Sequence, residues 1–365
     1  MPKELKVTHI VGARPNFVKA APLVKALEAK GVSQSLIHTG QHYDDIMSDA
    51  FFRDLNMPTP DFNLQVGGGS QFDQLSKLML GLPDALTALS PDALILYGDV
   101  NSTMVASIVA NRLDIPVIHV EAGLRSGDMR MPEESNRKIV DMFAELHLTT
   151  SPEALENLVN EGANASSVHE IGNTMIDSLF ASAHLFDFER IQAKLGVPEK
   201  FGVVTMHRGG NVDDPERVKE IVESLTKAAA MTTLVLPLHP RGRATLMDAG
   251  LDKVDNLVVC DPLGYTDFLS LVGKAQFVVT DSGGVQEETT VMGIPCLTLR
   301  PNTERPITIT EGTNRLVTAS TLSDEIAAVL AGDFEIKGPP VLWDGKAAVR
   351  GADVIVNFLN GKKES

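Results

Sequence analysis

Short runs of apolar, often β-branched residues alternate with longer amphipathic segments along most of the chain. The short runs are typical of strands buried on both faces of a sheet, and the longer segments have the periodicity of helices. In the first half we predict strands at 5–11, 34–38, 93–97, 117–120, 146–149 and 168–171, and helices at 17–29, 44–55, 71–89, 103–113, 134–144, 152–161 and 175–183. Strands and helices that alternate with short connections indicate a parallel sheet covered on both faces.

The same alternation restarts after a polar helical stretch at 187–195. The second half predicts strands at 201–205, 233–236, 257–259, 277–280 and 295–299, helices at 215–230, 243–249, 265–271 and 285–292, and a closing helix at 346–359. The pattern therefore predicts an α/β chain with two Rossmann-like domains, at 1–185 and 186–342, followed by a helical segment at 343–365. Ligands of such sheets bind beyond the carboxyl ends of the strands, so we expect the two domains to face a cleft.

Composition narrows the classes of partner. The 365 residues suffice for two domains with their own cores, and the formal net charge of −16 argues against a nucleic acid as the main partner while still allowing a small anionic substrate. We see no apolar run of about 20 residues and no signal peptide at the start, so we expect a cytoplasmic protein without a membrane span. The two cysteines, Cys260 and Cys296, lie in apolar runs without metal-ligand spacing, which favours buried free thiols and predicts no metal site.

A glycine turn follows the predicted strand at 277–280. The stretch from Asp281 to Glu288 passes through Ser282, Gly283 and Gly284 before the next predicted helix begins. Adjacent glycines let a backbone approach a ligand closely, and the N–H groups at a helix start favour a phosphate. A strand-to-helix turn capped by Asp281 or Ser282 is the alternative interpretation of these residues.

Two cations follow the first predicted strand. Arg14 lies in the turn after it and Lys19 lies near the start of the next helix, so both could reach a diphosphate at the carboxyl edge of the sheet. The spacing Gly-x-Gly-x-x-Gly is absent from this turn. The first domain is therefore not expected to hold a dinucleotide cofactor.

Carboxylates follow two neighbouring strands and begin a helix. Asp99 comes after the strand at 93–97, Glu121 after the strand at 117–120, and Glu133 precedes the helix at 134–144. Each one alone could be a helix cap or a dipole partner. Converging carboxylates raise one another's pKa, so three of them in a cleft are typical of acid/base chemistry.

A histidine, His207, ends the first strand of the second half. It could donate to a phosphate or carry a proton near neutral pH, or it could have a structural role. With these motifs in place, the chain resembles the non-hydrolysing UDP-N-acetylglucosamine 2-epimerases. The resemblance rests, in chain order, on 12–19, 39–44, 98–103, 119–127, 132–137, 172–174, 207–208, 281–288 and 303–306.

The resemblance implies a glycosyltransferase type B fold in which the closing helix crosses back to the first domain. It also implies reversible C2 epimerisation of UDP-N-acetylglucosamine to UDP-N-acetylmannosamine in a homodimer, with UDP as a bound species and with no cofactor or metal. In this family a proton leaves C2 and UDP leaves C1, which gives a 2-acetamidoglucal, and UDP then adds back. Such chemistry needs a base, an acid on the opposite face and cations that hold the diphosphate.

Carried over by position, the resemblance assigns catalytic roles to Asp99, Glu121, Glu133 and His207. It assigns contacts with the diphosphate or their support to Arg14, Lys19, Arg137, Ser282, Gly283 and Gly284. It further implies a ribose contact at Glu288, a uracil neighbour at Phe268, a substrate-binding arginine at Arg305 and a second, regulatory site that includes Gln41 and His42.

One departure keeps other activities open. Many members have His-Arg-Arg-Glu-Asn where this chain has a histidine, an arginine, two glycines and an asparagine at 207–211, which leaves the regulation and the sugar substituents undecided. A related UDP-diacetamido-uronate epimerase is one alternative. A glycosyltransferase on the same fold, a hydrolysing relative and a silent nucleotide-sugar sensor are the others.

Overall fold

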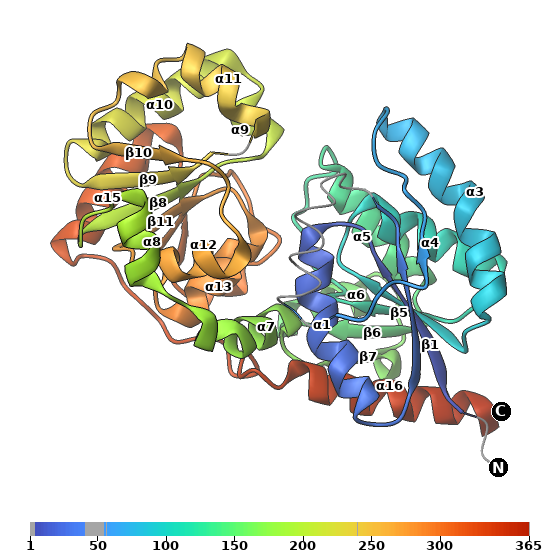
Figure 1. The fold of residues 1–365 in the computed structure, drawn as a ribbon. Helices are drawn as coiled ribbons and strands as arrows, with labels where there is room; N and C mark the ends of the chain where they lie inside the picture. Colours follow the sequence, from blue (N-terminus) through green and yellow to red (C-terminus); the bar gives the residue numbers. More distant parts are fainter. Residues whose placement is uncertain (1–3, 41–54, 56, 239, 365) are drawn as a thin grey trace. The chain divides into compact units, whose positions relative to one another are not determined.

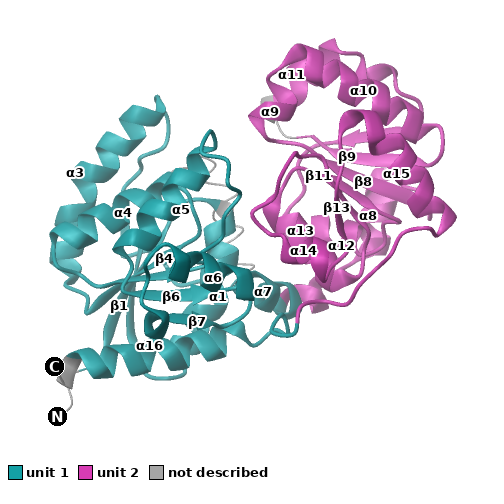
Figure 2. Ribbon diagram, turned by 180° about the vertical axis from the view of Figure 1, so that it is seen from behind, with its two compact units in different colours: residues 1–181, 341–365 teal, residues 182–340 magenta. Residues whose placement is uncertain are grey.

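The computed structural model describes residues 4–40, 55, 57–238 and 240–364. The chain divides into two compact units (Figure 2): unit 1 comprises Met1–Ala181 and Val341–Ser365, and unit 2 comprises Ser182–Pro340. Unit 2 is therefore inserted between two segments of unit 1. No helix in the described part of the chain combines the length and the apolar character needed to cross a membrane.

Unit 1 is built on a parallel sheet (Figure 1). Within the described residues this sheet has seven strands in the order β3-β2-β1-β4-β5-β6-β7. The strands are β1 (Lys6–Val11), β2 (Ser33–His38), β3 (Phe62–Asn63), β4 (Ala93–Tyr97), β5 (Val117–Val120), β6 (Leu146–Thr149) and β7 (Val168–Glu170). The strand order reverses between β1 and β4, which is the place where such sheets bind ligands.

Helices cover both faces of this sheet because successive residues of a buried strand point to opposite sides. Along β4, Ile95 and Tyr97 join one apolar cluster while Leu94 and Leu96 join another, and none of the four is exposed to solvent. The helices of unit 1 are α1 (Arg14–Glu28), α3 (Gln71–Leu89), α4 (Asn101–Arg112), α5 (Pro132–Phe143), α6 (Pro152–Asn160), α7 (Thr174–Ser182) and α16 (Ala347–Glu364).

Helix α16 is an integral part of unit 1. Ile355 and Leu359 are buried in the same cluster as Leu23 of α1. The carboxylate of Asp177 on α7 accepts hydrogen bonds from the backbone N–H groups of Ala347 (3.1 Å) and Ala348 (2.7 Å), which are free donors at the helix start. The chain returning from unit 2 is thus fixed to unit 1 at the beginning of α16 and along its apolar face.

Unit 2 contains a second parallel sheet. Among the described residues it has six strands in the order β10-β9-β8-β11-β12-β13. These are β8 (Phe201–Thr205), β9 (Thr233–Pro237), β10 (Leu257–Cys260), β11 (Val278–Thr280), β12 (Cys296–Thr298) and β13 (Asn314–Leu316). The helices are α8 (Phe188–Leu195), α9 (Gly209–Val212), α10 (Pro215–Ala229), α11 (Pro240–Asp248), α12 (Tyr265–Val272), α13 (Gly283–Met292), α14 (Ile307–Thr310) and α15 (Ala319–Ala331). Within β8, a Cβ on Gly202 would lie 2.3 Å from the Phe277 ring, so glycine is required there.

The alternating pattern predicted from the sequence is confirmed in both sheets, and three differences have local causes. Helix α1 begins at Arg14 because proline in its first turn favours a helix start, so the preceding turn is shorter than predicted. Strands β3 and β13 are too short to give a periodic signal. Helix α15, which was not predicted, starts at a capping box made by Thr318 and Thr321. The helix predicted at 44–55 falls almost entirely outside the described residues.

Candidate active site

Asp99 and Glu121 lie just beyond the carboxyl ends of the neighbouring strands β4 and β5. The two strands are tied together there, because the N–H of Gly98 donates to the carbonyl of Val120 at 3.0 Å. Glu121 has a φ of 69°, which is a left-handed backbone conformation that residues other than glycine rarely adopt. Such conformations persist where the surrounding structure enforces them and occur often at functional sites.

Glu121 is paired with Lys19 of α1. The Lys19 Nζ atom lies 2.6 Å from Glu121 Oε2, and both side chains are buried. A Cβ on Gly98, whose φ is 62°, would lie 3.1 Å from the same Nζ atom, so the glycine leaves room for the lysine. A buried carboxylate that faces an ammonium group is held in its ionised form, and it can accept a proton when the ammonium moves to another anion.

Asp99 is paired with Arg137 of α5. The guanidinium of Arg137 is buried and donates to Asp99 through Nη1 and to Glu134 through Nη2, the latter at 2.5 Å. Glu134 also accepts from the N–H groups of Ser126 (2.9 Å) and Gly127 (3.0 Å). Burial raises the pKa of Glu134, but Arg137 and these N–H groups more than offset it and lower the pKa. The side chain of Asp99 is therefore held by Arg137, which is itself held by a charge-assisted hydrogen bond to Glu134.

The structure describes some of the other residues predicted for this part of the site and not others. Glu133 is half-buried in the first turn of α5, beside Glu134. Arg14 begins α1, although its side chain is not described. Gln41 and His42 lie outside the described residues.

Sequence reasoning missed a buried pair below the two carboxylates. His119 of β5 lies with its Nδ1 atom 2.6 Å from Asp141 Oδ1 of α5 and its Nε2 atom 2.9 Å from the carbonyl oxygen of Gly98. Burial raises the pKa of Asp141, but His119 and then Arg125 more than offset it, so the pKa is lowered. The partners are 22 residues apart in the sequence, and no local pattern joins them.

In unit 2, the predicted glycine turn opens directly into α13. Ser282 is the N-cap residue, but its side chain makes no capping hydrogen bond, and Gly283 and Gly284 form the first turn of the helix. Asp281 does not cap this helix either, because it accepts from the N–H groups of His207 (3.2 Å) and Arg208 (3.0 Å). The helix start at Gly283 is therefore not capped by its own turn, as an anion site requires.

Asp281 also holds the imidazole of His207. The distance from His207 Nδ1 to Asp281 Oδ1 is 2.8 Å, and the histidine side chain remains 49% exposed while the aspartate is buried. Burial raises the pKa of Asp281, but His207 more than offsets it and the pKa is lowered. The structure thus brings His207 to the glycine turn, with its Nε2 atom on the side away from Asp281.

Arg305 is buried behind the glycine turn. Its Nε atom lies 2.8 Å from Glu287 Oε1, and its Nη1 atom donates to Glu304. Glu304 is also paired with Arg300 at 2.7 Å. A Cβ on Gly283 would lie 2.3 Å from Arg305 Nη1, so glycine permits the close approach of this guanidinium to the helix start. Arg305 therefore places positive charge beneath the turn rather than on its surface.

Glu288 and Phe268 lie on adjacent helices of unit 2. Glu288 is 4% exposed, and burial raises its pKa to about 8, a shift that the hydrogen bond from Tyr265 opposes and the charge of Glu287 increases. Phe268 of α12 is partly buried against the apolar cluster that contains Val285. At neutral pH Glu288 is therefore a carboxylic acid that can both donate and accept a hydrogen bond.

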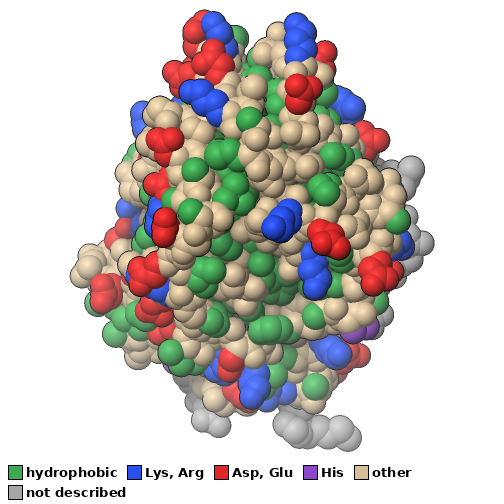
Figure 3. Space-filling view, turned by 90° about the vertical axis from the view of Figure 1, so that its left-hand side faces the viewer, with side chains coloured by type: hydrophobic (Ala, Val, Ile, Leu, Met, Phe, Trp, Pro, Cys, Tyr) green, Lys and Arg blue, Asp and Glu red, His purple; other side chains and the backbone are tan. Residues whose placement is uncertain are grey.

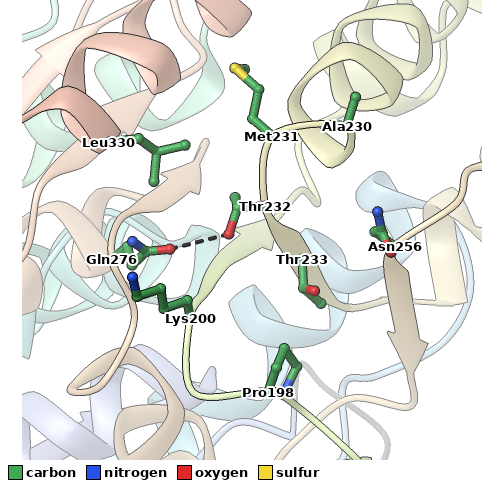
Figure 4. Close-up of a pocket in the computed structure, with 9 residues that line it drawn as sticks. All are labelled: Pro198, Lys200, Ala230, Met231, Thr232, Thr233, Asn256, Gln276 and Leu330. Carbon is green, nitrogen blue, oxygen red and sulfur yellow. Dashed lines mark hydrogen bonds between the residues drawn. The ribbon is translucent and has the colours of Figure 1, made fainter.

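A pocket of about 470 Å³ lies at the opposite edge of the unit 2 sheet (Figure 4). Its lining residues include Lys200, Thr232, Asn256 and Gln276, each of which comes just before β8, β9, β10 or β11. They therefore mark the amino ends of the strands, whereas ligands of parallel sheets bind at the carboxyl ends. None of the predicted site residues that the structure describes lines this pocket, and we do not regard it as the active site.

The described residues contain no group of three or more His, Cys, Asp or Glu side chains arranged to hold a metal ion. On the face shown in Figure 3, acidic and basic side chains are interspersed with apolar ones. This face carries no continuous basic surface of the kind that binds a polyanion.

Comparison with known proteins gives a consistent result. The family model described as UDP-N-acetylglucosamine 2-epimerase matches residues 25–356. The UDP-N-acetylglucosamine 2-epimerase of Methanocaldococcus jannaschii is 36% identical over 86% of this chain and 88% of its own length. The UDP-2,3-diacetamido-2,3-dideoxy-D-glucuronate 2-epimerase of Pseudomonas aeruginosa is 38% identical over 87% of this chain and 89% of its own length.

The fold comparison agrees with the sequence comparison. The crystal structure of the M. jannaschii enzyme in complex with UDP-GlcNAc and UDP matches with a TM-score of 0.90 at 34% identity. The match covers 97% of this chain and 100% of the other. The predicted fold class, two Rossmann-like halves of the glycosyltransferase type B kind, is thereby confirmed.

Proposed function

The chain belongs to the UDP-N-acetylglucosamine 2-epimerase family, and from this membership we propose that it interconverts UDP-N-acetylglucosamine and UDP-N-acetylmannosamine. The observation that carries the proposal is the match over 97% of the chain to a relative solved with UDP-GlcNAc and UDP. The paired carboxylates beyond β4 and β5 supply the acid/base groups that inversion at carbon requires.

The proposed reaction is an elimination followed by a re-addition. A carboxylate takes the proton from C2, the electrons of that bond form the C1–C2 double bond, and the C1–O bond to UDP breaks. The products of this half are a 2-acetamidoglucal and UDP. UDP then adds back to C1 while an acid on the other face returns a proton to C2. Asp99 and Glu121 are assigned to these proton transfers, with Glu133 as a third acid near the start of α5.

We assign UDP binding mainly to unit 2. The helix start at Gly283 offers N–H groups to the diphosphate, and His207 lies beside it. Glu288 fits a ribose hydroxyl because it can donate and accept, and Phe268 is assigned to the uracil. In unit 1, Lys19 would exchange its bond with Glu121 for the diphosphate, which frees that carboxylate to act as a base.

The test is turnover of UDP-N-acetylglucosamine in deuterated water. We expect UDP-N-acetylmannosamine to form and deuterium to enter C2 of both sugars. Asp99→Asn and Glu121→Gln should each lower kcat by at least about a hundredfold, as the loss of a general acid or base does. Glu145→Gln, at an exposed carboxylate of unit 1, is the matched control. If no deuterium enters C2, the epimerase proposal fails.

A second candidate substrate follows from the P. aeruginosa relative, which is named for a diacetamido-uronate sugar. At 209–210 this chain has two glycines where many family members have an arginine and a glutamate, so two side chains close to His207 in the sequence are missing. The two UDP sugars should therefore be compared directly by their kcat/KM values in one reaction mixture. The sugar with the higher kcat/KM is the substrate.

We also propose that the chain forms a homodimer. Helix α3 exposes Phe72 (79%), Met79 (42%) and Leu80 (79%). Residues seven and eight positions apart lie on the same side of a helix, so these side chains form one apolar surface. Exposed apolar surfaces of this kind mark protein contacts, and a second copy of the chain is the partner proposed here.

A further inference from the structure

A buried histidine connects the two loops that carry Asp99 and Glu121. His119 has no exposed surface, and it lies on β5 two residues before Glu121. One ring nitrogen faces the carbonyl oxygen of Gly98, the residue just before Asp99. The other faces the carboxylate of Asp141, whose second oxygen accepts from the N–H of Gly123, two residues after Glu121, at 3.2 Å.

Both ring nitrogens of His119 face an oxygen atom. A carbonyl oxygen can only accept a hydrogen bond, so Nε2 carries a proton. The Asp141 carboxylate, which also lies 2.8 Å from Arg125 Nη1, faces the Nδ1 atom on the other side of the ring. The imidazole of His119 is thus held at both ends within the sheet.

The carboxylate of Asp141 on α5 has a cation beside it. Arg125 lies 2.8 Å from Asp141 and is shared with Glu161 at 2.6 Å. The Nε2 atom of His147 on β6 lies 3.0 Å from the backbone carbonyl oxygen of Asp141. The side chains of His119 and Asp141 are directed to the two loops.

We propose that His119 is a positioning residue: with Asp141 it holds the Gly98 carbonyl and the Gly123 N–H, and so sets the placement of Asp99 relative to Glu121. This inference rests on the proposed function, in which these two carboxylates move the C2 proton. Errors of about 1 Å in the placement of such groups cost on the order of a hundredfold in rate. Glu121, whose backbone has a φ of 69°, lies two residues before Gly123.

The test compares two conservative variants of the histidine. Glutamine places its amide nitrogen near the position of Nε2, so His119→Gln keeps the bond to Gly98 and loses the bond to Asp141. Asparagine places its amide nitrogen near the position of Nδ1, so His119→Asn keeps the bond to Asp141 and loses the bond to Gly98. Both variants lose one buried hydrogen bond, and His119→Gln, which loses the bond to a carboxylate, should be the more destabilised.

We expect kcat per folded molecule to fall by about tenfold to a hundredfold in His119→Asn. The fall should be less than about fivefold in His119→Gln, because Arg125 still holds Asp141 and its bond to Gly123. KM should stay within about threefold, and the dissociation constant of UDP, measured by calorimetry, should not change because UDP is assigned mainly to unit 2. His147→Gln is the matched control at a buried histidine of the neighbouring strand, and it should keep full kcat.

Equal kcat values in the two His119 variants, or a full kcat in His119→Asn, would overturn the proposal. These outcomes are separable from a failure of the proposed function. If Asp99→Asn and Glu121→Gln retain turnover, the assignment of the carboxylates is wrong. If those variants are inactive while His119→Asn is fully active, only the positioning role is wrong.

Discussion

Two buried acids of unit 2 show how neighbours decide the charge of a single side chain. Burial raises the pKa of both Glu304 and Glu288. The guanidinium groups of Arg305 and Arg300 reverse the effect at Glu304 and hold its pKa well below the usual range. At Glu288 the like charge of Glu287 adds to the effect of burial, the hydroxyl of Tyr265 opposes it only in part, and the pKa rises from 4.5 to about 8.

This difference predicts a pH dependence of stability. The folded state keeps the proton of Glu288 at pH values where the unfolded chain has released it, so the stabilisation is complete below pH 4.5 and is lost as the pH rises to about 8. Within this window the group contributes a slope of roughly 1.4 kcal/mol per pH unit. Glu288→Gln should remove that slope, measured as the free energy of unfolding of unit 2 in urea at pH 5, 6.5 and 8. Glu220→Gln, at an exposed carboxylate of the same unit, should retain it, and an unchanged slope in Glu288→Gln would contradict the assignment.

For single residues, the sequence predicts where a side chain lies in the fold better than which side chains it contacts. Asp99 and Glu121 could be placed at one edge of the sheet because the carboxyl ends of adjacent parallel strands meet there. The pairing of Lys19 with Glu121 depends on how α1 lies over the sheet, and a local pattern does not contain that information. The bond between His119 and Asp141 has the same origin, since it forms only when α5 packs against β5.

The bounds predicted for helices α13 and α3 agree with the structure to different extents. The amphipathic pattern predicted α13 from Val285, but the helix already begins at Gly283, where the glycine leaves room for Arg305. The bounds of α3 were predicted correctly, at 71–89. Its pattern did not show that part of its apolar surface faces away from unit 1.

The exposed surface of α3 predicts the effect of two substitutions on assembly. Phe72→Ser combined with Leu80→Ser removes the two most exposed apolar side chains of this helix without touching its buried residues. The variant should weaken the proposed dimer at least about a hundredfold, which size-exclusion chromatography with light scattering would show as a monomer. Val159→Ser, at an exposed apolar residue of α6, should leave the mass unchanged. A double variant with the mass of the parent would rule out α3 as the contact.

On the scale of the whole chain, unit 2 interrupts unit 1. The chain leaves unit 1 after Ala181 and returns at Val341. Sequence patterns could predict two α/β halves, since each half repeats the alternation of strands and helices. They could not predict what α16 packs against, because its apolar face fits any sheet or helix of suitable shape. The structure places that face against α1 in the core of unit 1.

This arrangement predicts which unit a core substitution in α16 destabilises. Ile355 is fully buried in the apolar cluster of unit 1. Ile355→Ala should lower the stability of unit 1 by about 2–5 kcal/mol and leave unit 2 unaffected. Hydrogen exchange measured by mass spectrometry should show faster exchange in β1 and β6 and unchanged exchange in β8 and β11. Val349→Ala, on the same helix at 54% exposure, is the control, and equal loss of protection in both units would contradict the prediction.

The insertion of unit 2 also sets an order of events during translation. Residues 182–340 emerge from the ribosome as one continuous segment and can complete their own core at once. Unit 1 begins earlier, but Ala352, Ile355 and Leu359 of its core are synthesised after all of unit 2. The nascent first unit therefore keeps apolar surface uncovered while the second folds. Domains that are synthesised first commonly fold first. Here unit 1 begins the chain but can complete its core only after unit 2 has been synthesised.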